Sequence, residues 1–155
     1  MSNYRRSLAF HLRIGDTPPG APARPDDATL ALRMRLLREE TGEALAALDA
    51  LAHTSGGAAA EPRLAAAAHE LADLLYVAYG TFVALGIDAD GVFAEVHAAN
   101  LRKAGAPRRG DGKQLRPDGW RPADVAGVLA SQRRTGAQGR IIAELAPDES
   151  AADNS

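Results

Sequence analysis

The apolar residues of this chain recur at helical spacing, and glycine- or proline-rich breaks separate the periodic segments. The pattern predicts five helices, which cover residues 2–13, 26–52, 62–85, 89–104 and a segment that begins at Pro122. The loops between them include residues 15–27, with four prolines, and the long stretch 105–121. Nothing alternates with the period of a strand, so we expect an all-α domain built as a four- to five-helix bundle.

The third predicted helix carries two charges in strongly apolar surroundings. Between Leu64 and Ile87 the only acidic or basic side chains are Glu70 and Asp73, with His69 beside them. At about 100° per residue, Glu70 falls between Leu74 and Val77, on the margin of the buried face. Solvated charges normally lie among other polar residues, so this pair is difficult to explain as ordinary surface.

The second predicted helix carries a matching pair, Glu40 and Glu43, with Glu39 further from the apolar arc. An antiparallel turn between the two helices would bring both pairs together. Four carboxylates in such a cluster repel one another, and a hard divalent cation such as Mg²⁺ or Mn²⁺ would relieve that repulsion. The alternative for the second helix alone is a solvated acidic face.

The fourth predicted helix and the loop after it have the opposite charge. Asn100 and Lys103 continue the inner face marked by Val92 and Val96, although a lysine that simply extends past the helix end is also common. Residues 102–121 contain seven basic and two acidic side chains, net +5, in a chain whose total is −2. A basic loop near an acidic metal cluster suits a polyphosphate substrate. Trp120 would stack on a base or anchor this loop.

The length and composition of the chain limit its domain number and exclude several types of site. The 155 residues suffice for one domain, which we place at residues 1–133, followed by a largely disordered extension over 134–155. The absence of cysteine excludes disulfides, thiolate zinc sites and cysteine nucleophiles. Neither a membrane span nor a signal peptide is evident, so we expect a cytoplasmic protein. The loop lacks interleaved aromatic residues, so we expect no binding to nucleic acid.

Two motifs together resemble a known superfamily. "EETGE" at residues 39–43 and "HELADLLY" at residues 69–76 form an ExxE–ExxD pattern, with 26 residues between Glu43 and Glu70. Downstream lie "EVHAANLRK" and "DGKQLRPDGWRPADV". Over roughly residues 8 to 130 the chain resembles the all-α NTP pyrophosphohydrolases, which include MazG-like proteins, dimeric dUTPases and phosphoribosyl-ATP pyrophosphohydrolases.

The resemblance implies specific roles for the residues above. It implies Mg²⁺ ligands at Glu40, Glu43, Glu70 and Asp73, with Glu39 either binding a second metal ion or orienting the attacking water. Acid–base chemistry then assigns the proton of that water to a carboxylate of the Glu39 and Glu43 group. It also implies contacts to sugar and phosphates from Asn100 and Lys103, with Lys113 and Arg116 contributed by the loop. A base pocket would include Phe10, His11 and Trp120.

The implied activity is Mg²⁺-dependent hydrolysis of a nucleoside triphosphate between its α and β phosphates, with Mn²⁺ as a substitute metal. dUTP or another non-standard nucleotide is the expected substrate, and the expected assembly is a homodimer or a dimer of dimers. The alternative is a catalytically weak nucleotide-binding, regulatory dimer of the same fold. A di-iron carboxylate bundle is set aside, because His69 and His97 do not form the Glu-x-x-His pairs that it needs.

Overall fold

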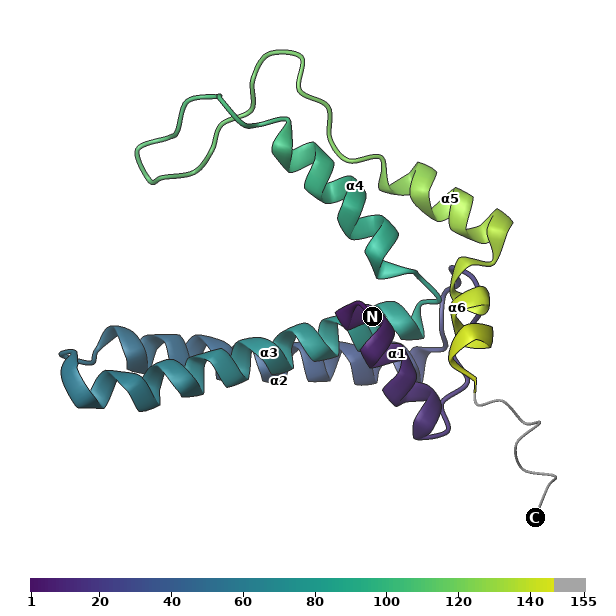
Figure 1. Cartoon of the computed structure of the whole chain (residues 1–155), viewed down its shortest axis with the longest axis horizontal. Helices are drawn as coiled ribbons and strands as arrows, with labels where there is room; N and C mark the ends of the chain where they lie inside the picture. The colour runs from purple at the N-terminus through teal and green to yellow at the C-terminus, as the bar shows by residue number, and fades with distance from the viewer. Residues whose placement is uncertain (147–155) are drawn as a thin grey trace.

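The computed structural model of the chain describes residues 1–146, and all of its regular elements are helices (Figure 1). They are α1 (Asn3–Arg13), α2 (Asp27–Ala52), the 3₁₀ turn η1 (Gly57–Ala59), α3 (Ala60–Ala84), α4 (Ala89–Leu101), α5 (Val125–Thr135) and α6 (Ala137–Leu145). The predicted all-α class is therefore confirmed over the described residues.

Side-chain caps fix where most of these helices begin. Ser2, Asp26, Asp88 and Asp124 each accept a hydrogen bond from a backbone N–H in the first turn of the helix that follows. The cap at Asp124 makes α5 begin at Val125, three residues after the predicted start at Pro122. Helix α4 ends at Leu101 rather than at residue 104, because the chain turns through Arg102–Gly105 before entering the loop.

Helices α2 and α3 form a long antiparallel hairpin, and α1 lies across the half of α3 farthest from the hairpin turn (Figure 1). The core lies where these helices meet α6, and it contains Tyr4, Leu8, Val83, Ala89 and Ile141. A buried hydrogen bond of 2.5 Å, from the Tyr4 hydroxyl to Gln138 Oε1, ties α1 to α6. The Gln138 amide in turn donates to the carbonyls of Pro19 and Val83.

Helix α6 differs from the expected disordered extension over residues 134–155. Ala137, Gln138 and Ile141 are buried in it, and Gly136 turns the chain between α5 and α6 with a φ of 58°. Nine residues of helix are short for isolated stability, so packing of this apolar face on α1 accounts for its order. Residues 147–155 lie outside the described part of the chain.

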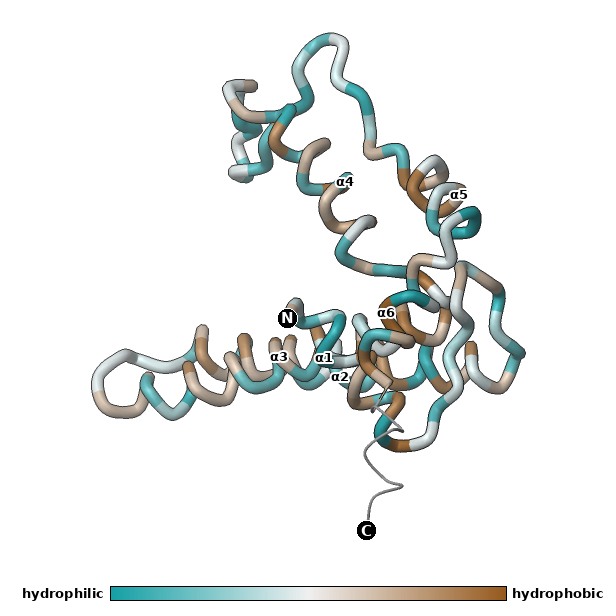
Figure 2. The backbone as a smooth tube through the Cα atoms, turned by 45° about the vertical axis from the view of Figure 1, so that its right-hand side comes forward, coloured by the Kyte–Doolittle hydropathy of each residue, from teal (hydrophilic) through white to brown (hydrophobic). Residues whose placement is uncertain are grey.

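The α2–α3 hairpin and the arm formed by α4 and α5 point in different directions. Helix α4 packs mainly on α5, and this arm leaves the hairpin at an open angle (Figure 1). Large apolar side chains are exposed on both parts, among them Leu45, Leu64, Leu71 and Leu75 on the hairpin and Phe93 and Leu101 on α4. Figure 2 shows brown, hydrophobic segments along the free part of the hairpin and along α4. Among the described residues no single helix could cross a membrane, and only the stretch Gly57–Ala84 joined to α4, with a bend of 115°, has a suitable length and composition.

Replacing Gly86 with alanine should lower the free energy of unfolding by more than about 2 kcal/mol. Gly86 has a φ of 69°, and an added Cβ would overlap the carbonyl oxygen of Ala21. Thermal unfolding followed by circular dichroism measures the effect. Gly110→Ala is the matched control, because a Cβ at that position meets nothing within 4 Å. Equal melting temperatures for the two variants would contradict this account.

Candidate metal and nucleotide site

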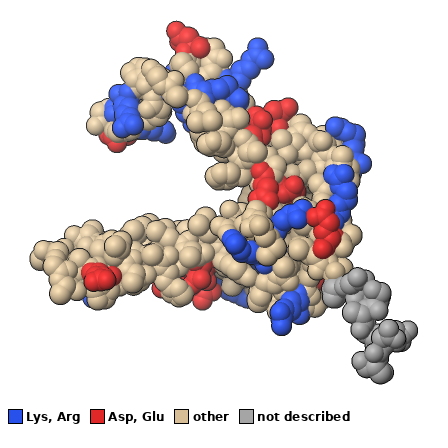
Figure 3. Space-filling view, viewed as in Figure 1, with Lys and Arg blue, Asp and Glu red and all other residues tan. Residues whose placement is uncertain are grey.

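Acidic side chains meet near the middle of the hairpin. Glu40 and Glu43 on α2 and Glu70 on α3 each offer a carboxylate oxygen, and these oxygens all lie within 4.8 Å of one another. Glu40 and Glu70 are half-buried, while Glu43 is exposed. The antiparallel turn thus brings together three of the four predicted metal ligands. In Figure 3, red acidic side chains lie on this hairpin.

The fourth predicted ligand, Asp73, lies one turn further along α3 from Glu70. Its Oδ2 is 3.3 Å from Nε2 of His69, and it is not part of the three-carboxylate group. Even so, its charge is among those that raise the pKa of Glu40. Glu39 is exposed on α2 and acts on Glu40 in the same way.

The electrostatics of Glu40 reflect this crowding. Partial burial raises the pKa of the Glu40 carboxyl, and the charges of Glu43, Asp73, Glu39 and Glu70 raise it further, in that order. The site therefore has an excess of negative charge, and its ligand atoms are all oxygens, which fits a hard divalent cation. Three carboxylates would also leave coordination positions for water and phosphate oxygens.

The predicted phosphate-binding residues lie on the other arm. Lys103 Nζ donates to Oδ1 of Asn100 over 2.6 Å at the end of α4. Arg116 and Lys113 are exposed on the loop that follows. Figure 3 shows blue side chains at the tip of this arm, across open space from the hairpin. Within one chain, the structure does not bring these residues to the carboxylates.

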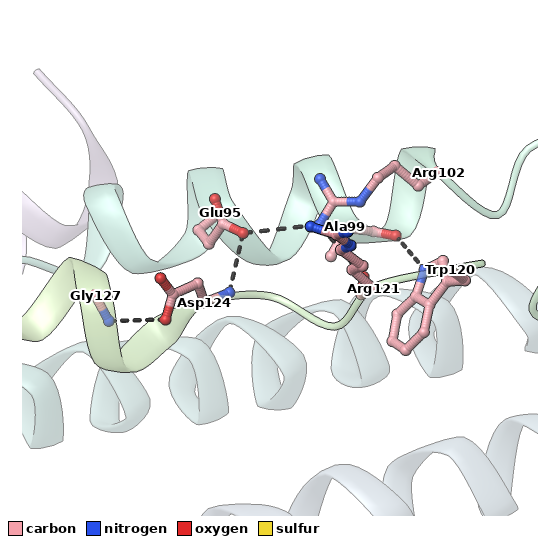
Figure 4. Close-up of polar contacts among 7 residues, drawn as sticks. All are labelled: Glu95, Ala99, Arg102, Trp120, Arg121, Asp124 and Gly127. Carbon is pink, nitrogen blue, oxygen red and sulfur yellow. Dashed lines mark hydrogen bonds and ion pairs between the residues drawn. The ribbon is translucent and has the colours of Figure 1, made fainter.

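Trp120 fastens the basic loop to α4 (Figure 4). Its indole N–H donates to the carbonyl of Ala99 over 2.9 Å. Nearby, Glu95 Oε1 accepts from the Asp124 backbone N–H over 3.0 Å and lies 3.8 Å from the Arg102 guanidinium. Lys103 and Arg116 both lie against the Trp120 ring, at 5.3 Å and 4.4 Å from its centroid. Of the two roles considered for Trp120, these contacts favour the anchor.

The other two predicted base-pocket residues differ in environment. Phe10 is 43% exposed and packs edge-on against Tyr76, with ring centroids 5.7 Å apart. His11 is only 5% exposed, and its Nδ1 lies 2.6 Å from Oδ2 of Asp16.

His11 also lines a pocket of about 490 Å³ between α2, the end of α3 and the proline-rich loop. Asp16 and Arg33 line this pocket as well, and neither was singled out from the sequence. One signal for Arg33 was available in the sequence. Arg33 precedes Glu40 by seven residues and therefore lies on nearly the same face of the helix.

A comparison with known protein families bears on the activity of the chain. The model of the phosphoribosyl-ATP pyrophosphohydrolase family matches residues 8–100, which is more than half of the chain. The chain belongs to this family. The match spans the five candidate carboxylates, Glu39, Glu40, Glu43, Glu70 and Asp73, and it ends before Lys103 and the basic loop. No curated protein matches the chain. Membership supports a nucleotide pyrophosphohydrolase activity and the use of a divalent metal ion, and the structure contains an acidic cluster.

Replacing Glu40 with glutamine should raise the melting temperature of the metal-free protein at neutral pH. A carboxyl whose pKa is raised on folding is stabilising when protonated, and it loses that contribution as the pH rises through its folded-state pKa. The neutral amide removes this repulsion, and it also removes a ligand, so added Mg²⁺ should stabilise the variant less than the wild type.

Differential scanning fluorimetry with and without Mg²⁺ measures both effects. Glu61→Gln, an exposed glutamate in the first turn of α3, is the control and should show neither the gain nor the loss. A Glu40→Gln variant with an unchanged response to Mg²⁺ would argue against Glu40 as a ligand.

Proposed function

We propose that the protein is a Mg²⁺-dependent nucleoside triphosphate pyrophosphohydrolase that cleaves between the α and β phosphates. The products would be a nucleoside monophosphate and pyrophosphate, and the substrate would be dUTP or another non-standard nucleotide. The observation that supports this proposal most is the convergence of Glu40, Glu43 and Glu70 on the hairpin of a chain in this family. Mn²⁺ would substitute for Mg²⁺, since both accept an all-oxygen ligand set.

The side chains have distinct tasks in this reaction. Glu40, Glu43, Glu70 and Asp73 would hold the cation, which when bound would neutralise phosphate charge and lower the pKa of a coordinated water. The water oxygen forms a bond to the α phosphorus, and the bond from that phosphorus to the α–β bridging oxygen breaks. Glu39 or Glu43 accepts the proton of the water, and pyrophosphate leaves with the bonding electron pair.

We also propose that the active unit is a homodimer or a dimer of dimers. Leu75 on the hairpin is 55% exposed and Phe93 on α4 is 67% exposed, as expected of faces that a second chain covers. The acidic hairpin and the basic loop are complementary in charge. A second chain seated between the arms would bring Lys103 and Arg116 to the carboxylates of its partner, where they would bind phosphate oxygens.

The variants Glu70→Gln and Asp73→Asn should each lose more than about 100-fold in turnover while keeping a folded structure, because each loses a metal-binding charge. A panel of nucleoside triphosphates with Mg²⁺, assayed separately for pyrophosphate and orthophosphate, measures the reaction. Glu61→Gln serves as the active control. Orthophosphate release in place of pyrophosphate would rule out α–β cleavage. Tight nucleotide binding without turnover would favour the regulatory binder.

Mixing two inactive variants tests whether a site uses two chains. If Glu70 and Lys103 of different subunits form one site, Glu70→Gln and Lys103→Ala homodimers should regain activity after subunit exchange, to roughly a quarter of the wild-type level. Sedimentation of the wild type and of each variant confirms that they assemble. Activity that stays at the sum of the two separate variants would show that the two residues do not act across subunits.

A further inference from the structure

A second feature of the hairpin lies outside the carboxylate cluster. The pocket of about 490 Å³ is bordered by the proline-rich loop and has apolar walls from Leu32, Val83 and Ala84. Two hydrogen bonds fix the loop: Ala23 N–H donates to the carbonyl of Leu85 over 2.9 Å, and Gly139 N–H donates to that of Gly20 over 2.7 Å. The pocket is therefore a preformed space with a tethered rim.

Arg33 lines this pocket, and its guanidinium includes a hydrogen-bond donor without a partner. Its Nε is buried and makes no hydrogen bond within the described residues. Burial lowers the pKa of the Arg33 guanidinium, and the charge of Asp16 offsets part of that effect. An arginine has only donors, and a buried donor left unpaired costs free energy, so the site favours a ligand that brings an acceptor atom.

Gly80 lets two polar side chains approach α3 at the base of this site. A Cβ at position 80 would lie 2.7 Å from His11 Nε2 and 3.1 Å from Arg33 Nη1. Both side chains therefore lie against the glycine backbone, where any larger residue would displace them. His11 Nδ1 lies within hydrogen-bond distance of Oδ2 of Asp16, and the other Asp16 oxygen has no hydrogen bond among the described residues.

The pocket and the carboxylates share one face of the hairpin. Arg33 precedes Glu40 by seven residues, and Gly80 follows Asp73 by seven residues, so each pair differs in angle by only about 20°. The rise of an α-helix places each pair about 10 Å apart along the axis. A ligand with phosphates on the metal cluster would thus extend its other end toward Arg33 and Asp16.

We propose that this pocket binds the base of the nucleotide, and that Arg33 and Asp16 select a base that presents a carbonyl oxygen beside a ring N–H. Uracil and hypoxanthine have such an edge. This inference rests on the proposed function, which supplies the phosphate end of the ligand. It assigns the base to His11, Asp16 and Arg33, and it leaves Phe10 and Trp120 outside the pocket.

The selectivity follows from donors and acceptors. The carbonyl oxygen accepts from the guanidinium of half-buried Arg33, and the ring N–H donates to the carboxylate of Asp16. Cytosine and adenine have an amino group in place of that carbonyl, so their N–H donor would face the N–H donors of Arg33. The mismatch leaves Arg33 unpaired and adds an unpaired amino group.

Two matched substrate pairs test the inference, because dUTP and dCTP, and ITP and ATP, differ chiefly at this edge. The wild type should prefer dUTP and ITP by at least about tenfold in kcat/KM. Arg33→Met and Asp16→Asn should each reduce that ratio toward one, mainly through KM. Arg35→Met, an exposed arginine on the same helix that does not line the pocket, should keep the wild-type ratio.

Calorimetric titration with deoxyuridine, deoxycytidine and inorganic pyrophosphate provides a readout that does not depend on hydrolysis. Deoxyuridine should bind more tightly than deoxycytidine, and only in chains with Arg33 intact. If the Arg33→Met variant does not fold, the folded Asp16→Asn variant still tests the inference. Hydrolysis without preference within the pairs would overturn this inference and leave the proposed function standing. Selective deoxyuridine binding without hydrolysis would support this inference and overturn the proposed function. Loss of pyrophosphate binding alone in Arg33→Met would show a phosphate site and would also overturn the inference.

Discussion

The rest of the structure has to offset the repulsion between the carboxylates on α2 and α3. Charges that raise the pKa of Glu40 would push two free helices apart. The short turn at η1 and the extended contact between α2 and α3 keep them in place. The hairpin thereby keeps carboxylate oxygens of Glu40, Glu43 and Glu70 within 4.8 Å of one another.

The fold was predictable wherever a local signal determined it. Proline and glycine breaks and aspartate caps gave the hairpin helices within a residue or two, because caps act within one turn. Helix α6 was not predicted, since its order depends on contacts with α1 across the whole length of the chain. Such tertiary stabilisation leaves little trace in a nine-residue window.

The candidate site likewise contains residues that a local sequence signal reveals and residues that only the fold reveals. Glu40, Glu43 and Glu70 could be found from the sequence because a charge on an apolar face is a local anomaly, and helix geometry fixes its direction. Arg33 and Asp16 were missed, because an arginine at the margin of a helix and an aspartate in a loop are ordinary until the fold places them beside His11. Helical periodicity carries no information on where the basic arm lies relative to the hairpin.

The single hydrogen atom that serves as the side chain of Gly80 has an evolutionary consequence. Mutation to any larger residue would press on His11 and Arg33 together, while Asp73 and Glu70, two to three turns away along α3, would keep their positions. On the proposed assignment of the pocket and the carboxylates, divergence at this position would change which compounds a descendant protein accepts without altering the groups that act on them.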